Sequence, residues 1–238
     1  MVACSWIKLL LSLSIVTHLF LNAPAFADGM EPETTVIVLN EAEGEVSINI
    51  KNTDPEPALL HSAIEDIPED GEPLVIITPP VARVDPGERQ MVRFLFVGKE
   101  PLKTQRLKRA TFEGIPQART GSGATIGISL RQNLPLILHP KGLPLHNAPW
   151  ELLTWHLQGK TLSVRNDSAY VVRLSEEVVL RPQKRKAYLP RSYILPGETL
   201  GVAMGTAPVG VTSVSISPAT VYGFVVETYD AQIVANAP

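Results

Sequence analysis

Apolar and polar residues alternate along much of the chain, and one stretch shows this pattern most clearly. In ATIGISLRQNLPL, residues 124–136, the apolar side chains from Ile126 onward alternate with Gly, Ser, Arg and Asn. A period of two residues is typical of a β-strand with one apolar face. The stretch is long for a strand, and its polar side carries little that would suit an exposed edge of a soluble protein. The pattern therefore raises the question of what covers the apolar face.

The first half of the chain predicts strands throughout. Residues 35–50 indicate a hairpin or a pair of strands around a turn at Glu43-Gly44, the second strand with an alternating VSINI pattern. The other strands expected before the quoted stretch cover residues 58–64, 74–77, 90–97 and 108–115. Pro, Gly, Asn and Asp lie between them and favour turns. No segment carries a sustained apolar repeat of 3.6 residues, so we expect this half to be all-β.

Residues 139–144, HPKGLP, interrupt the pattern with two prolines and a glycine, which is typical of a hinge between domains. A second β series follows, with strands expected at residues 150–157, 161–165, 170–180, 193–195, 200–204, 211–216 and 221–228. About seven short strands on each side of the hinge fit two immunoglobulin-like β-sandwiches. We therefore expect an all-β protein with domains at residues 28–139 and 140–238.

The N-terminus has the features of a cleaved secretory signal. Lys8 precedes a mostly apolar run at residues 9–21, and Ala25-Phe26-Ala27 matches an A-x-A cleavage site. A membrane anchor is the weaker interpretation because the apolar run is too short. Removal of residues 1–27 from the 238-residue chain would leave 211 residues, which is enough for two domains of about a hundred residues each.

Cysteine content and charge narrow the class further. Cys4 is the only cysteine and lies in the expected signal, so the mature chain would hold no disulfide and would depend on an ordinary hydrophobic core. Loss of Lys8 leaves 20 basic residues against 24 acidic ones, a net charge of −4 that does not suggest a nucleic-acid partner. No later apolar run approaches the about twenty residues of a membrane span, so we expect a soluble mature protein.

The sequence shows no catalytic or metal-binding constellation. A G-x-S-x-G nucleophile motif is absent, and Gly121-Ser122-Gly123 lacks the Lys-Ser/Thr ending of a phosphate loop. The histidines outside the expected signal show no metal-ligand spacing; they are His61, His139, His146 and His156. Lys184-Arg185-Lys186 is interpreted as a solvated loop, with contact to an acidic partner as the alternative. We expect no enzyme activity and no cofactor, and a protein that acts by binding.

A set of short motifs extends over residues 34–228. The segment ITPPVARVDPGE, residues 77–88, is close to the pattern T-P-P-L-x-R-L-x-P-G, and Val92-Arg93-Phe94 follows it. The further matches are Ile115-Pro116, residues 140–143, 152–155 and 159–166, and Tyr170. Together these motifs resemble the PapD-like periplasmic chaperones of the chaperone–usher pathway, which assembles pili.

The resemblance implies a fold and a mode of binding. In that family two immunoglobulin-like domains meet at an angle, and pilus subunits bind in the cleft and along the last strand of the first domain. A subunit lacks one strand, and the chaperone lends its own strand to fill the groove, a form of β-augmentation. On this resemblance the donor side chains are Ile126, Ile128 and Leu130, with Leu134 continuing on the same face. The implied partners are pilus subunits and an outer-membrane usher.

The chain departs from the family where the subunit's C-terminal carboxylate is held. Thr34 fits the family's Thr, but Thr35 stands at the Arg position and Pro135 at the Lys position, and neither can pair a carboxylate by charge. We favour Arg131 as the replacement because it lies on the donor strand. The other cations nearest in sequence are Arg83, His139 and Lys141. Neutral hydrogen bonds are the alternative, from Thr34, Thr35, Gln132 and Asn133.

A second departure concerns the contact between the domains. The family's interdomain triad of Glu, Arg and Asp falls here on Gln105, His139 and Val221. Loss of all three charges together avoids leaving one of them buried and unpaired. We therefore expect no ionic lock between the domains.

The sequence leaves alternatives open. Alternation in residues 126–134 also fits side chains that face the domain's own core. From another class, an exported immunoglobulin-like structural or adhesive surface protein would stay with a fibre, whereas a chaperone would be recovered from the periplasm with one subunit. A secreted hydrolase has no supporting motif. No nucleotide site is expected, since another subunit's strand can replace the lent one, and self-association of the free chaperone is left open.

Overall fold

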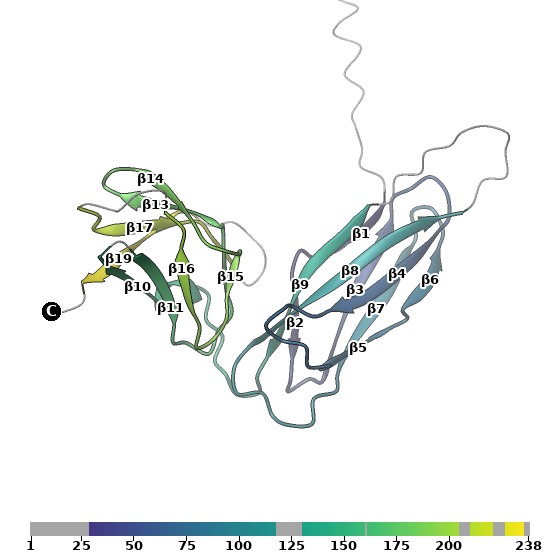
Figure 1. Cartoon of the computed structure of the whole chain (residues 1–238). Coiled ribbons are helices and arrows are strands. Elements are labelled where there is room, and N and C mark those ends of the chain that lie inside the picture. The colour runs from purple at the N-terminus through teal and green to yellow at the C-terminus, as the bar shows by residue number, and fades with distance from the viewer. Residues whose placement is uncertain (1–28, 118–129, 160, 205–209, 221–226, 236–238) are drawn as a thin grey trace, which may run out of the picture.

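The computed structural model describes residues 29–117, 130–159, 161–204, 210–220 and 227–235. The chain forms two β-sandwiches, which Figure 1 shows as two lobes joined by one connection. The expected signal at residues 1–27 and the first part of the quoted stretch, including Ile126 and Ile128, lie outside the described residues. Within the described ranges, no helix has the length and apolar character needed to cross a membrane.

The first sandwich packs a four-stranded sheet against a five-stranded one. The strand orders are β1-β3-β7-β5 and β2-β9-β8-β4-β6. Only β2 and β9 run parallel among these described neighbours. The strands are β1 Met30–Pro32, β2 Ile37–Asn40, β3 Glu45–Asn52, β4 Ala58–Glu65, β5 Val75–Thr78, β6 Val81–Val84, β7 Arg89–Phe96, β8 Arg106–Pro116 and β9 Arg131–His139.

Alternation along these strands sets the inner faces of the first sandwich. In β3, Ile48 and Ile50 are buried, and Ile48 lies opposite Val92 of β7. Phe94 of β7 meets Phe112 of β8 edge to face across the core, with ring centroids 6.4 Å apart. The all-β prediction is confirmed for this half of the chain.

The hairpin predicted over residues 35–50 is wrong in its pairing. β2 belongs to the five-stranded sheet and pairs with β9, whereas β3 pairs with β1 and β7 in the other sheet. The turn between them, in which the Gly44 N–H donates to the carbonyl of Asn40 at 3.1 Å, carries the chain from one sheet to the other. Gly44 has φ 74°, a conformation that favours glycine.

The second sandwich contains a seven-stranded sheet, β14-β13-β17-β19-β10-β11-β16, and a three-stranded sheet, β15-β12-β18. Its core surrounds Trp155, which is fully buried. The elements are η1 Pro149–Leu152, β10 Leu153–Gln158, β11 Thr161–Asn166, β12 Val172–Leu174, β13 Glu177–Arg181, β14 Arg185–Tyr188, β15 Tyr193–Ile194, β16 Thr199–Val202, β17 Ser213–Ile216, β18 Pro218–Ala219 and β19 Tyr229–Ala235.

Three expectations for this half need correction. The strand expected at residues 150–157 begins only at Leu153, because Pro149 starts a 3₁₀ turn. The strand expected at 170–180 is two strands, divided where the Ser175 hydroxyl accepts the N–H of Glu177 at 3.2 Å. The basic cluster 184–186 is a turn residue followed by the start of β14 rather than a loop.

Apolar side chains from both sandwiches meet at the junction. The buried members of this cluster are Val36, Ile67, Leu107 and Ile137 from the first sandwich and Val171 from the second. Tyr193 and Leu195 of the second sandwich pack against it. Burial of these side chains stabilises one arrangement of the two sandwiches.

Neutral hydrogen bonds also cross the junction. They involve Gln105 and His139, which stand where the family has charged residues. The Gln105 side chain accepts the N–H of Val171 at 2.8 Å and donates to Nδ1 of His139 at 2.9 Å. His139 Nε2 lies 2.8 Å from the carbonyl of Leu143, which can only accept, so this nitrogen carries the proton. Gln105 and His139 thus form an uncharged chain between the sandwiches.

The expectation of no ionic lock is nevertheless wrong, because an ion pair joins the two sandwiches at a different position. Glu69, in the turn after β4, lies 3.1 Å from Arg191 of the second sandwich and accepts a hydrogen bond of 2.8 Å from the hydroxyl of Tyr193. Burial and then this hydrogen bond raise the pKa of Tyr193 to about 12. The contact was missed because Glu69 and Arg191 are brought together only by the tertiary fold.

Replacement of Gln105 with Leu is expected to lower the free energy of unfolding by about 1–3 kcal/mol, because it leaves the N–H of Val171 and Nδ1 of His139 buried without partners. We also expect a broader range of interdomain distances in solution scattering. Urea unfolding checks the first result, with Gln90→Leu on β7, away from the junction, as the control. Equal stability and identical scattering for Gln105→Leu and the wild type would contradict this account of the junction.

Candidate functional site

One edge of β9 is open over part of its length. β8 pairs with β9 from Arg131 to Leu138, but β2 pairs with the other edge only from Leu136 onward. No described strand lies beside that edge at residues 131–135. Unpaired backbone N–H and C=O groups on a strand edge can hydrogen-bond to another chain. The open edge is therefore a candidate site for an added strand.

The donor side chains predicted from the sequence differ in their exposure, and two of them lie outside the described residues. Leu130, directly before β9, is 45% exposed, which suits a side chain that binds another protein. Ile126 and Ile128 lie outside the described residues. Leu134 is only 7% exposed and packs with Leu136 in the core of the first sandwich. We therefore remove Leu134 from the donor set: beyond Leu130 this face of the strand turns into the domain's own core.

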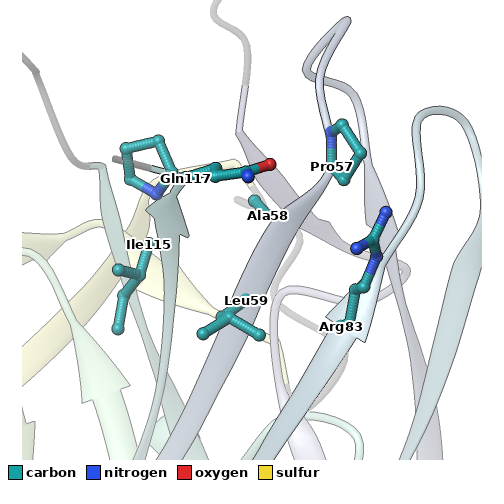
Figure 2. A pocket seen from close by; sticks show the side chains of 7 residues that line it. Pro57, Ala58, Leu59, Arg83, Ile115 and Gln117 are labelled. Atoms are coloured by element: carbon teal, nitrogen blue, oxygen red, sulfur yellow. The ribbon is translucent and has the colours of Figure 1, made fainter. Parts of the chain in front are cut away.

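Further apolar side chains are exposed on the same sheet. Leu59 of β4 is 44% exposed, Ile115 of β8 is 43% exposed, and the two are cross-strand partners. They line a pocket together with Pro57, Ala58, Arg83, Pro116 and Gln117. Figure 2 shows Leu59 between Ile115 and the Arg83 side chain. This apolar surface lies at the end of β8 farthest from the junction.

Of the residues predicted to bind a carboxylate, Thr34 and Thr35 lie at the end of the open edge nearest to the junction. Thr34 precedes β2, where its hydroxyl donates to the carbonyl of Val36 at 2.8 Å and accepts the N–H of the same residue at 3.3 Å. Thr35 next to it is exposed. The first pair between β2 and β9 is Ile37 with Leu136, so both threonines are at the end of β2 nearest to Pro135.

Arg131 and Asn133 already have partners within the first sandwich. Arg131 forms an ion pair with Glu65 and a hydrogen bond of 3.2 Å to the hydroxyl of Thr111. Asn133 accepts two hydrogen bonds from Arg109, at 2.6 Å to its side chain and 2.7 Å to its carbonyl. Because Glu65 already neutralises Arg131, this residue is a weaker candidate for a carboxylate than the sequence suggested.

Arg109 is the cation that sequence reasoning missed. It lies on β8 directly opposite Pro135, the position at which the resemblance places a lysine. Burial lowers the pKa of Arg109, and Tyr193 and Glu65 partly offset this effect. Arg109 is 26 residues before Pro135 in the sequence and comes next to it only through the pairing of β8 with β9.

Metal-ligating side chains do not cluster in the part of the chain that the structure describes. Among them, no group of three or more His, Cys, Asp or Glu side chains could hold a metal ion. The histidine at the junction, His139, is buried and bonded to Gln105 and Leu143. What the geometry offers is an open strand edge, exposed apolar side chains and cations at one end.

Two immunoglobulin-like sandwiches with an open edge on the last strand of the first define a protein that can bind another polypeptide by sheet extension. Two family models match this chain and identify the class of protein. "Pili and flagellar-assembly chaperone, PapD N-terminal domain" matches residues 29–144, and "Pili assembly chaperone PapD, C-terminal domain" matches residues 148–229. The chain belongs to the PapD-like pili assembly chaperones.

Individual relatives have the same character. The chain is 40% identical over 199 residues to "Uncharacterized fimbrial chaperone YhcA" of Escherichia coli K12, covering 83% of this chain and 88% of the relative. It is 30% identical to "Chaperone protein FimB/FhaD" of Bordetella pertussis, over 65% of this chain and 69% of the relative. The chain is therefore a fimbrial chaperone by family.

Solved structures share the two-domain fold. The CupB2 chaperone of Pseudomonas aeruginosa matches with a TM-score of 0.69 and 22% identity, over 85% of this chain and 100% of that one. A second match is a chain from the structure of the Salmonella enterica SafA pilin in complex with the SafB chaperone. It has a TM-score of 0.72 and 15% identity, over 90% of this chain and 100% of that one. These likenesses confirm the expected fold class.

Proposed function

We propose that this chaperone binds pilus subunits by donor-strand complementation and delivers them to an outer-membrane usher. The observation that carries the proposal is the open edge of β9 at residues 131–135, directly preceded by the exposed Leu130. A subunit that lacks one strand can hydrogen-bond to this edge and receive the alternating apolar side chains before it. Complexes such as that of SafB with SafA give a precedent among structural relatives.

Side-chain burial supplies part of the binding energy. Ile126, Ile128 and Leu130 would each contribute about 1.5–3 kcal/mol if buried in a subunit groove, about 5–9 kcal/mol together. Association costs an estimated 4–15 kcal/mol in lost freedom. Backbone hydrogen bonds along β9 and contacts near the junction must therefore add the remaining affinity.

The proposal includes a location and a processing step. Cleavage after Ala27 would release a mature chaperone into the periplasm, with the first sandwich at residues 28–139 and the second at 140–238. The signal-like N-terminus and the family support this. In the proposed cycle the bound subunit leaves when another subunit's strand replaces the lent one, so the cycle needs no catalysis or cofactor by the chaperone.

Co-expression with the pilus subunits encoded near this chain tests the proposed function. We expect a complex of one chaperone and one subunit in a periplasmic extract, isolated through a tag on the chaperone and sized by gel filtration. The subunit expressed without the chaperone should be degraded or aggregated. Recovery of this chain in assembled surface fibres, with no soluble complex, would instead support a structural or adhesive role.

A further inference from the structure

The side chain of His139 lies at the end of β9, where the first sandwich meets the hinge, and the residue is only 6% exposed. Its Nδ1 atom lies 2.9 Å from the side-chain nitrogen of Gln105, and its Nε2 atom lies 2.8 Å from the carbonyl of Leu143. Gln105 in turn contacts the second sandwich. Its main-chain N–H donates to the carbonyl of Ala169 at 2.8 Å, and its side-chain oxygen accepts the N–H of Val171 at 2.8 Å. His139 is therefore one hydrogen bond away from the contact between the sandwiches.

Two backbone groups determine every donor and acceptor in this chain of hydrogen bonds. The N–H of Val171 can only donate, so the Gln105 amide turns its oxygen toward Val171 and its NH₂ group toward His139. The carbonyl of Leu143 can only accept, so the proton of the neutral ring is on Nε2, and Nδ1 is the acceptor. The chain is thus complete only while the ring of His139 is uncharged.

Addition of a proton to His139 breaks this pattern. Nδ1 becomes a donor and faces the NH₂ group of Gln105, which is also a donor. If the Gln105 amide turns over, its oxygen accepts from Nδ1, but its NH₂ group then faces the N–H of Val171. In either case two buried donors point at each other, and a hydrogen bond is lost without replacement. In the second case the lost bond is the one between the sandwiches.

The charged and titratable groups around His139 have other partners within the described structure. At the end of β2, the carboxylate of Glu41 accepts two backbone N–H groups, at 2.9 and 2.7 Å, and in the hinge the side chain of Lys141 is exposed. Of the described residues that line the pocket beside the ring, His146 is the other titratable one, and its Nδ1 atom accepts a backbone N–H at 3.2 Å. From the second sandwich, the ring of Tyr170 lies against His146, and its hydroxyl donates to a backbone carbonyl of the hinge at 2.8 Å.

We infer that His139 is a proton-controlled switch of the domain arrangement: its neutral ring completes the hydrogen bonds between the sandwiches, and its protonated ring breaks one of them and loosens the junction. The loosened state binds one proton more than the closed state, so acid favours it. An imidazole changes its charge between about pH 5 and 8, so the switch responds near neutral pH. The apolar cluster of the junction and the ion pair of Glu69 with Arg191 do not involve this proton. The sandwiches therefore move more freely in acid but stay joined.

Hydrogen exchange of the Val171 amide tests the inference, followed by NMR between pH 8 and pH 5 in the full mature chaperone without a partner. After correction for the intrinsic pH dependence of exchange, the opening constant of this amide should rise as the pH falls. The rise should reach up to about tenfold per pH unit, because opening takes up one proton. Spin labels on the two sandwiches should show a broader distance distribution at pH 5 than at pH 8. The range stays above pH 5 so that carboxyl groups of ordinary pKa remain ionised.

Three variants distinguish the switch from a purely structural role. His139→Asn keeps an acceptor but cannot be protonated, so its opening constant should not depend on pH. Gln105→Glu offers one oxygen to the N–H of Val171 and the other to a protonated ring, so its junction should be at least as tight at pH 5 as at pH 8. His146→Gln removes the other histidine of the pocket and should keep the wild-type profile.

Three results would overturn the inference. One is an opening constant of the Val171 amide that does not change with pH in the wild type. Another is the same pH dependence in the wild type, His139→Asn and Gln105→Glu. The third is loss of the pH dependence in His146→Gln, which would assign it to His146 instead.

Discussion

Replacement of Leu130 with Asp is expected to abolish the complex with a subunit while the chaperone itself stays folded. Leu130 is 45% exposed in the free chain, so a charge there costs little in the folded monomer. In the complex the same charge would enter an apolar groove without a partner, which costs several kcal/mol beyond the lost apolar burial. The dissociation constant should rise by more than about 100-fold. The same is expected for Ile128→Asp, at a position outside the described residues.

Co-purification of a tagged chaperone with its subunit checks this result, and thermal unfolding checks that the variant is folded. Ile76→Asp is the matched control, because Ile76 is 54% exposed on β5 in the opposite sheet of the same sandwich. Full recovery of the complex with Leu130→Asp would show that the strand before β9 is not the donor. Equal loss with Ile76→Asp would show that the effect is not specific to that strand.

Replacement of Asp70 with Ala is expected to have the largest effect on stability. Lys108 of β8 is 1% exposed, and its ammonium group lies 3.1 Å from the Asp70 carboxylate and 2.6 Å from the Asp70 carbonyl. Arg106 also pairs with the Asp70 carboxylate. Removal of that carboxylate leaves Lys108 buried with only the half-exposed Asp66 as an acidic partner. Loss of one partner from such a buried pair costs about 3–5 kcal/mol.

Urea unfolding measures this loss, with Asp85→Ala as the control. Asp85 pairs with Arg83 at 3.0 Å, but both side chains are largely exposed, so we expect a change of at most about 1 kcal/mol. Equal stability of Asp70→Ala and Asp85→Ala would contradict the role assigned to the buried pair.

The Asp70 contribution should also depend on pH. Burial acts to raise the pKa of Asp70, but the hydrogen bonds from Arg106 and Lys108 outweigh it and hold the pKa below its ordinary value of 3.8. A carboxyl group whose pKa is lower in the folded state stabilises the fold above its unfolded pKa, and this stabilisation is lost as the pH falls through the folded pKa. The stability difference between the wild type and Asp70→Asn should be constant near neutral pH and shrink below about pH 4. A difference that grows toward low pH would contradict this assignment.

The sequence predicted most of the elements of the fold because alternation is a local property. Strands such as β3, β7 and β11 were expected within a residue or two of their ends. Pairing is not local, and the expected pairing of the strands that became β2 and β3 was therefore wrong. Leu134 shows the same limit: it continues the alternation of Leu130, but only the position of β9 in its sheet shows that Leu134 lies in the core.

The charged residues of the site were the hardest to predict. Arg131 was favoured because it is on the donor strand, yet the fold pairs it with Glu65. Arg109 lies on a different strand, and no spacing in the sequence places it opposite Pro135. Its position follows from the register of β8 with β9. The donor strand was predicted through the family resemblance, whereas its open edge and the end of that edge at Pro135 required the register of β2 with β9.

Amide hydrogen exchange of the chaperone, alone and bound to its subunit, tests the central claim most directly. Residues 131–134 should exchange rapidly in the free chaperone wherever their N–H groups lie on the open edge, since no described strand pairs there. In the complex the account predicts that peptides covering this segment exchange at least about tenfold more slowly, because a subunit strand accepts and donates hydrogen bonds along β9. Unchanged exchange in this segment, with protection elsewhere on the chaperone, would contradict donor-strand binding.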